Sequence, residues 1–379
     1  MPQKNTSEKQ NLVATSITFL ILGAAFATWA SRIPAIRELS ALTPVTLGYV
    51  LLVKGIGTVL IMPAVAVCIE KLGSKRSSVL FGMILVLTLI PMTMAPNWEV
   101  LAVVLFFAGV GAGGYNVSIN ALASELEMST GRSYMSLVHS FFGVGIFSGA
   151  LAGTLMASLV PSADMHFWGM AIFLVILLIG SYQYLPDREK KTETVKTGFK
   201  IPQGAVLWLG VICFLAASIE DSITNWVALF FADYVGAGEG IASIGYAAYA
   251  GSMLVMRFFG DRLKPRFGAK ALISGGSVVA AIGVMIALIS PNITVATIGF
   301  IAAGAGVALT FPMLFSAAGR QGAVALASVV TMGSVGGMLS QPVMGLLVEH
   351  FELIGGFVFI ALCMLAVGAG SWKAKLLSK

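Results

Sequence analysis

Charge, cysteine and histidine are all scarce in this chain of 379 residues. Only 11% of it is charged and 58% is hydrophobic, whereas soluble domains carry about 25% charged residues. A soluble fold of this length could not bury so much apolar surface, so the chain must be surrounded by lipid. Cys68, Cys213 and Cys363 lie in or beside apolar runs without metal-ligand or disulfide spacing, and we interpret them as small buried side chains.

Several chemical motifs are missing as well. The three histidines, His139, His166 and His350, fall in separate segments, which argues against an integral-membrane enzyme with a catalytic pair or metal cluster. No glycine-rich run ends in the Lys-Ser/Thr pair of a nucleotide-binding loop, so ATP does not drive this protein directly. We expect no catalytic residue, no metal and no cofactor. Nucleic acid is not an expected partner either, because the basic residues form short clusters between apolar runs.

Twelve apolar segments are long enough to cross a bilayer, which takes about 20 residues at 1.5 Å each. They cover roughly 12–37, 44–67, 77–95, 98–122, 134–159, 165–185, 205–232, 241–262, 269–290, 293–317, 322–348 and 353–372. The first segment has no signal-peptide cleavage site and is expected to be retained. We predict an all-α membrane protein of twelve transmembrane helices. Two pseudo-symmetric six-helix bundles, 1–186 and 204–379, would be joined by a cytoplasmic linker over 187–203.

The two halves repeat each other in sequence. Trp29 is followed by a Leu-Gly-Tyr triplet, and Trp226, 197 positions later, is followed by Ile-Gly-Tyr. Residues 70–75 are echoed by residues 265–270, each with a central glycine and a terminal lysine. A membrane protein built from two similar halves is the usual plan of a secondary transporter.

Basic residues are distributed unevenly between the two sides of these segments. If the N-terminus is cytoplasmic, 20 of the 23 Lys and Arg residues lie in cytoplasmic loops, tails or helix ends. Arg32 and Arg37 remain on the opposite side, and Lys54 falls inside the second segment. The positive-inside rule therefore predicts that both termini are cytoplasmic, in a multi-pass protein of the inner membrane.

Short motifs spread over nearly the whole chain resemble one branch of a known family. They are Asn116–Ala121, Glu125, Gly131-Arg132, Met135-Ser136, His139, Glu220, Asn225-Trp226, Gly245-Tyr246, Arg257, Gly260–Leu263, Arg266–Gly268, Pro312, Ala318–Arg320 and Pro342. This set is similar to the MosC/YbjJ-like branch of the major facilitator superfamily. The resemblance implies a proton-linked carrier of small solutes that works by alternating access, as a monomer in the bilayer. The name MosC, from a rhizopine locus, points to sugar- or inositol-like solutes.

The chain departs from the family pattern in two places. The superfamily's loop motif usually has Asp where this chain has Glu70 and Pro265. The antiporter signature of the fifth helix usually includes a proline, and here only its glycines are present. Import and export therefore both stay open. The alternatives are a proton-driven antiporter that exports drugs or metabolites and, less favoured, a non-transporting membrane sensor, for which a soluble output domain is missing.

Ionisable residues inside the apolar segments are the first candidates for proton coupling. Glu220 and Asp221 lie near the middle of the seventh segment, where a charge costs on the order of 3 kcal/mol. A carboxylate removed from water binds its proton more tightly, which suits a site that loads and unloads. His139 is the third candidate. The alternatives are a fixed charge pair that holds the halves together and, for His139, a hydrogen bond between helices.

Polar and aromatic residues of the same segments are candidates for solute binding. They are Trp29, Arg32, Lys54, Tyr115, Asn116, Asn120, Asn225, Trp226 and Gln341. In the family fold the first, fourth, seventh and tenth helices usually line the cavity. A salt bridge from Lys54 to Glu220 or Asp221 is as well supported as a solute contact, and Trp29 and Arg32 would also suit an interfacial anchor.

Charged residues near the cytoplasmic ends of the segments suggest a gate. They are Glu70, Lys71, Lys75, Arg76, Glu125, Arg132, Asp261, Arg262 and Arg266. Glu125 and Arg132 have the E-x6-R spacing of sugar porters. A bistable set of ion pairs could hold one state closed, and the alternative is a solvated loop with scattered charges.

Overall fold

The computed structural model describes residues 7–160, 162–186 and 203–378, and every regular element among them is helical. Most of the predicted linker, 187–202, lies outside the described residues. The contacts divide the chain into two compact units, Met1–Leu42 with Val53–Thr194, and Thr43–Leu52 with Val195–Lys379. The predicted bundles differ from these units mainly at residues 43–52, which group with the second unit.

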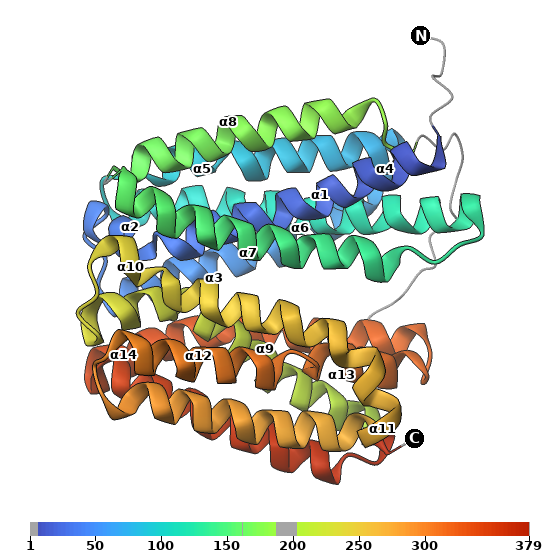
Figure 1. Cartoon of the computed structure of the whole chain (residues 1–379). Coiled ribbons are helices and arrows are strands. Elements are labelled where there is room, and N and C mark those ends of the chain that lie inside the picture. Colours follow the sequence, from blue (N-terminus) through green and yellow to red (C-terminus); the bar gives the residue numbers. More distant parts are fainter. Residues whose placement is uncertain (1–6, 161, 187–202, 379) are drawn as a thin grey trace. The chain divides into compact units, whose positions relative to one another are not determined.

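The first part of the chain forms eight helices (Figure 1). They are α1 (Glu8–Ser31), α2 (Ile33–Leu39), α3 (Pro44–Leu60), α4 (Met62–Leu87), α5 (Leu89–Met92), α6 (Trp98–Thr130), α7 (Met135–Leu159) and α8 (Ala163–Tyr182). Within the first unit, α1 packs along α7 and α4 packs along α6. Glycines make the first contact close, because a Cβ on Gly23 would clash with the Phe142 carbonyl and one on Gly145 with the Leu20 carbonyl.

The rest of the chain forms six α-helices and two short turns of other helix types. They are α9 (Gly204–Leu229), a π-helical turn (Phe230–Tyr234), α10 (Glu239–Ala242), α11 (Ile244–Ile289), α12 (Ile293–Val307), α13 (Thr310–Gly319), α14 (Ala323–Lys373) and a 3-10 turn (Lys375–Leu377). In the second unit α11 packs along α12, and α9 along α14. Gly283 and Gly299 lie face to face, and a Cβ on either would be 2.5 Å from the carbonyl oxygen of the other.

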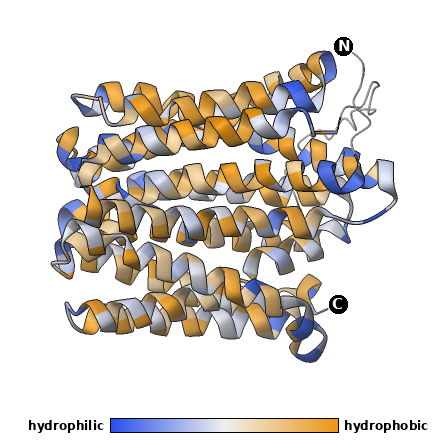
Figure 2. Cartoon of the chain, turned by 45° about the horizontal axis from the view of Figure 1, so that its top comes forward, coloured by the Kyte–Doolittle hydropathy of each residue, from blue (hydrophilic) through white to orange (hydrophobic). Residues whose placement is uncertain are grey.

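Hydrophobic residues cover most of the length of each helix, and hydrophilic residues gather near the helix ends (Figure 2). In the described part of the chain, nine helices are long and apolar enough to cross a membrane, or ten if α2 and α3 form one bent span. The chain is thus a multi-pass, all-helical membrane protein. The count of twelve spans and the cytoplasmic location of both termini stay predictions.

Three of the long helices are interrupted inside. Gly73 in α4, Gly268 in α11 and Glu352 in α14 have non-helical backbone angles. Each interruption falls between two segments that the hydropathy pattern separates, 44–67 from 77–95, 241–262 from 269–290, and 322–348 from 353–372. Both glycines have positive φ, which favours a residue without a Cβ.

Candidate functional site

An ion pair lies within the second unit, between α9 and α11. Oε1 of Glu220 is 3.8 Å from Nη2 of Arg257, and the two side chains are 26% and 31% exposed. Nε of Arg257 also donates to the carbonyl oxygen of Ala308, at 3.3 Å. Glu220 is the 17th of the 26 residues of the apolar helix α9, so the pair lies at a depth where an isolated charge would be costly. Arg257 is part of a family motif in the sequence, but the sequence did not identify it as the partner of Glu220.

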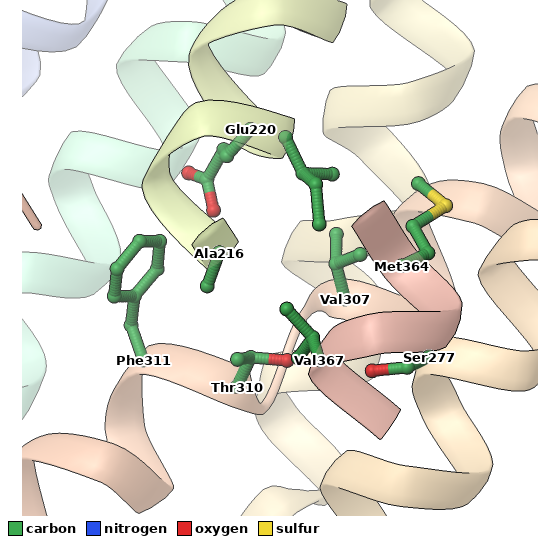
Figure 3. A pocket seen from close by; sticks show the side chains of 9 residues that line it. Ala216, Glu220, Ser277, Val307, Thr310, Phe311, Met364 and Val367 are labelled. Carbon is green, nitrogen blue, oxygen red and sulfur yellow. The ribbon is translucent and has the colours of Figure 1, made fainter. Parts of the chain in front are cut away.

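Glu220 also lines a small cavity inside the second unit (Figure 3). The volume is about 10 Å³, which is close to the space that one water molecule needs. The other walls come from α9, α11, α12, α13 and α14, and they include the buried hydroxyl residues Ser277 and Thr310. The carboxyl group of Glu220 therefore faces a cavity with polar groups in a mostly apolar wall.

Asp221 has different surroundings from Glu220, because neighbouring side chains on a helix diverge by about 100°. Its side chain is exposed, and it packs so closely on Gly337 of α14 that a Cβ there would clash with the carboxylate. Nδ2 of Asn225 donates to the Asp221 carbonyl oxygen at 2.8 Å. The two acidic residues therefore contact different helices of the second unit.

Two of the predicted solute-binding residues meet next to Asp221. Nε1 of Trp226 donates to Oε1 of Gln341 at 3.3 Å, and Nε2 of Gln341 donates to the Gly337 carbonyl oxygen at 3.2 Å. Trp226 is 1% exposed and Gln341 is 3% exposed. This contact links α9 to α14 and encloses the indole ring.

In the first unit, Trp29 and Arg32 are both buried, at 3% and 1% exposure. Arg32 lies at the break between α1 and α2, and its backbone N–H donates to the Trp29 carbonyl oxygen. His166 of α8, which the sequence analysis did not select, is also 1% exposed. Gly153 of α7 lets the helices come together here, because a Cβ on it would overlap Ser31 and approach the His166 ring at 3.6 Å.

Lys54 of α3 is half-buried, and its Nζ lies 5.2 Å from the centre of the Phe26 ring. A cation over an aromatic face is stabilised by the ring quadrupole. The predicted salt bridge from Lys54 to Glu220 or Asp221 stays a prediction.

A chain of hydrogen bonds connects α6 to α7 in the first unit. Nδ2 of Asn120 donates to the carbonyl oxygen and to Oδ1 of Asn116, at 2.8 and 2.9 Å. Oδ1 of Asn120 lies 3.1 Å from Nε2 of His139, whose ring meets that of Phe19 edge to face. Tyr115 is fully buried and packs against Gly82 of α4. A Cβ on Gly82 would lie 2.8 Å from the Tyr115 ring.

The same network assigns the tautomer of neutral His139. The Asn116 carbonyl oxygen can only accept, so the group of Asn120 that faces it must be the amide nitrogen. Oδ1 of Asn120 is then the acceptor for His139, and Nε2 carries the hydrogen. Nδ1 is the nitrogen at which this imidazole gains or loses a proton.

The predicted gate residues of the first unit have the following contacts. Ser74 donates to Oε2 of Glu125 at 2.6 Å, and Nζ of Lys75 lies 4.9 Å from the Tyr182 ring centre. Arg132 forms an ion pair with Glu8 at 2.9 Å. The Tyr134 hydroxyl group, followed by the Glu8 charge, raises the pKa of Arg132. Three others, Glu70, Lys71 and Arg76, are exposed.

In the second unit the gate residues Arg262 and Arg266 are exposed, and the guanidinium of Arg266 lies 5.3 Å from the Phe267 ring centre. The side chain of Asp261 lies outside the described part of the structure. Whether these residues act as a gate stays a prediction.

Glu127, near the end of α6, is a further residue that the sequence analysis missed. Its Oε1 accepts hydrogen bonds from the backbone N–H groups of Tyr134 and Met135, at 2.6 and 2.8 Å, and from Ser133 Oγ at 3.1 Å. The residue before α7, Tyr134, offers no side-chain cap of its own. Glu127 therefore caps α7 from the preceding helix. The one signal in the sequence was a carboxylate eight residues before the start of α7.

The chain is similar in sequence and in fold to known membrane transporters. The family model of the Major Facilitator Superfamily matches residues 14–323. An uncharacterized MFS-type transporter of Yersinia pestis is 30% identical over 95% of this chain and 94% of its own. Membrane protein MosC of Rhizobium meliloti is 25% identical over 94% of this chain and 88% of its own. The structure of a D-xylose-proton symporter matches with a TM-score of 0.77 at 13% identity, covering 97% of each chain.

The chain belongs to the major facilitator superfamily. Its members are transporters of small solutes and not enzymes, and the predicted resemblance to MosC is confirmed. The fold likeness to the xylose symporter, at 13% identity, supports the architecture alone.

Proposed function

We propose that this protein is a proton-coupled secondary transporter of a small polar solute. The carrying observation is Glu220, a carboxylate well inside an apolar helix, 3.8 Å from Arg257 and at the wall of a cavity the size of one water molecule. In this arrangement a proton on Glu220 removes one charge of an ion pair. The pair weakens, and the contact between α9 and α11 changes with the state of protonation.

Asp221 and His139 are the other two proton-coupling candidates. Asp221 neighbours Glu220 but packs on α14, so its protonation would act on another helix contact. His139 belongs to the hydrogen-bonded chain through Asn120 in the first unit. A carrier that alternates between two states gains from a titrating group in each half, because each half then responds to the proton gradient.

The solute is proposed to be sugar- or inositol-like. Two observations support a polar solute: the likeness to MosC, and the amide and indole groups of Asn225, Trp226 and Gln341 in the second unit. A site that carries both amide groups and aromatic rings suits hydroxylated rings. The protein is proposed to act as a monomer of the inner membrane with both termini cytoplasmic, because of its charge distribution.

Flux in proteoliposomes tests the proposal. A thermal-shift screen of sugars, inositols, nucleosides and aromatic acids identifies a solute, and its uptake is then measured with and without a pH gradient. Wild-type protein is expected to accumulate the solute only with the gradient. Glu220→Gln is expected to lose accumulation but to retain exchange of labelled for unlabelled solute, because exchange needs no net proton movement.

Asp221→Asn serves as the matched comparison, since it removes a neighbouring carboxylate from the same helix. If both variants accumulate solute as well as wild type does, the coupling assignment is wrong. If no solute moves at all while ligands still change the melting temperature, a sensor is favoured over a transporter. Accumulation in the reverse direction, driven by proton counterflow, would favour the efflux alternative.

A further inference from the structure

A long apolar groove lies between α1 and α8 in the first unit. Five positions of α1 from Lys9 to Ile17 face five positions from Ile176 to Tyr184, the last of which follows the end of α8. Both sets have the same i, i+1, i+4, i+5, i+8 spacing. The groove has a volume of about 510 Å³. It is about 12 Å long, since it spans eight residues of helix. Neither the ion pair of Glu220 nor the network of His139 contributes to it.

Small side chains make this groove hollow. Ala14 and Ser181 form its floor and are 2% and 4% exposed, whereas the rims are formed by Val13 and Ile176, which are 51% and 63% exposed. A Cβ on Gly180 would meet no atom within 4 Å. The groove is therefore open along the side of the helix pair, and its apolar walls suit a hydrocarbon chain.

The end of the groove at the start of α1 carries positive charge. Lys9 is the charged residue of its lining, and Glu8, the acidic neighbour, is engaged by Arg132 and Tyr134. Gln10 is occupied as well, because its Oε1 accepts the Ser7 backbone N–H in a capping box. The partial positive charge at the start of α1 is opposed by the partial negative charge at the end of α8, so the side chains decide the net charge here. Lys9 and Arg132 together outnumber Glu8. This end therefore attracts an anion.

We propose that the groove holds one acyl chain of an anionic phospholipid, whose phosphate group lies against Lys9. Lys9 at one end complements the negative phosphate group, and the apolar walls along the helices complement the acyl chain. A zwitterionic lipid would fill the channel equally well but would gain less from Lys9, because basic residues next to a membrane select anionic head groups by about 1 kcal/mol each. The site lies between two helices of the first unit and does not depend on proton coupling.

Native mass spectrometry of the purified full-length protein tests this site. The protein is extracted from vesicles with equal amounts of phosphatidylglycerol and phosphatidylethanolamine, and the lipids that stay bound are counted as detergent rises. Wild type is expected to retain one phosphatidylglycerol preferentially. Gly180→Leu fills the groove and is expected to lower that retention about tenfold, equivalent to about 1.4 kcal/mol. Lys9→Gln is expected to retain a lipid, but its preference for phosphatidylglycerol over phosphatidylethanolamine should fall about fivefold.

Gly169→Leu is the matched control, because Gly169 also lies on α8 with open space at its Cβ but outside the groove. It is expected to bind lipid as wild type does, which excludes a general effect of a larger side chain on α8. Equal retention by Gly180→Leu and Gly169→Leu overturns the proposal. So does equal retention of the two phospholipids by wild type, or displacement of phosphatidylglycerol by an equal amount of oleate, which would make a free fatty acid the occupant.

Discussion

Gly73 and Gly268, which are 195 positions apart in the repeat, have nearly the same backbone conformation. Gly73 has φ 82° and ψ 159°, and Gly268 has φ 76° and ψ 156°. Each interrupts a long helix, and neither would place a Cβ within 4 Å of another atom. The duplicated sequence motif thus has a duplicated geometry. Because nothing surrounds the missing Cβ, the need for glycine comes from the backbone alone.

Alanine at either position is expected to destabilise the protein. A residue with a Cβ pays about 1–3 kcal/mol for a positive φ combined with an extended ψ, a region that is essentially restricted to glycine, and there is no neighbouring atom whose clash would add to the cost. Gly73→Ala and Gly268→Ala should each lower the melting temperature by a few degrees. The effects should add in the double variant, since the two sites lie in separate units. Thermal unfolding in detergent, followed by tryptophan fluorescence, measures all three.

Gly275→Ala is the control for this pair. Gly275 lies on the same helix as Gly268, also with open space at its Cβ, but it has helical angles. Alanine is favoured over glycine there by about 1 kcal/mol, so this variant should be as stable as wild type or more stable. A loss of stability at Gly275 equal to that at Gly268 would contradict the assignment to backbone strain.

Removing both members of the Glu220 and Arg257 pair is expected to cost less stability than the two single removals added together. Arg257→Gln leaves the carboxylate without its cation, and Glu220→Gln leaves the guanidinium without its anion. The double variant should be more stable than the sum of the two single losses by about 1 kcal/mol, which is within the usual range for coupled neighbours. A double-mutant cycle on thermal unfolding gives this number. A coupling near zero would mean that the two charges do not act on each other.

The membrane class, the apolar segments and the repeat were predictable from the sequence because they depend on composition and period. A stretch of about 20 apolar residues spans a bilayer whatever its neighbours are. The interruptions at Gly73 and Gly268 lie between predicted segments for the same reason. Helix boundaries do not follow from composition, since α6 continues to Thr130, eight residues beyond the predicted segment.

Side-chain partners were harder to predict, because they depend on how helices rotate about their axes. Arg257 was visible only as a motif residue, although it meets Glu220 from 37 positions away. Arg132 has the spacing of a sugar-porter motif with Glu125, yet its described ion pair is with Glu8, 124 positions earlier. Tyr115 and Asn116 are adjacent in sequence, but the first is buried and the second exposed. The spacing of residues along one helix does not predict which residues of another helix they contact.

Glu127 is expected to stabilise the start of α7. Replacing it with glutamine keeps an acceptor oxygen but removes the negative charge, and alanine removes both. Glu127→Gln should therefore cost less stability than Glu127→Ala, which should cost about 1 kcal/mol, as for the loss of a helix cap. Glu38→Gln, at an exposed site on α2, is the control and should have no effect. Equal stability of Glu127→Ala and wild type would show that water replaces the cap.

Asn120 is expected to hold His139 in one tautomer. Because Oδ1 of Asn120 accepts the hydrogen on Nε2, neutral His139 should be protonated at Nε2 and not at Nδ1. Nitrogen NMR of histidine-labelled protein in bilayers distinguishes the two forms. Asn120→Leu removes the acceptor and should give a mixture of tautomers, whereas Asn116→Ala, which only orients the amide of Asn120, should give a smaller change.

The functional meaning of this arrangement is tested by the dependence of transport on pH. Asn120→Leu should shift the pH profile of solute accumulation if His139 takes part in proton coupling, while Asn116→Ala should leave the profile close to that of wild type. A variant that only disturbs helix packing would lower the rate at every pH by the same factor. When His139→Gln is already present, adding Asn120→Leu should no longer shift the pH profile. The imidazole that Asn120 holds in one tautomer is then absent. A pH profile that stays the same in all three variants would place His139 outside the coupling mechanism and leave it as a contact between α6 and α7.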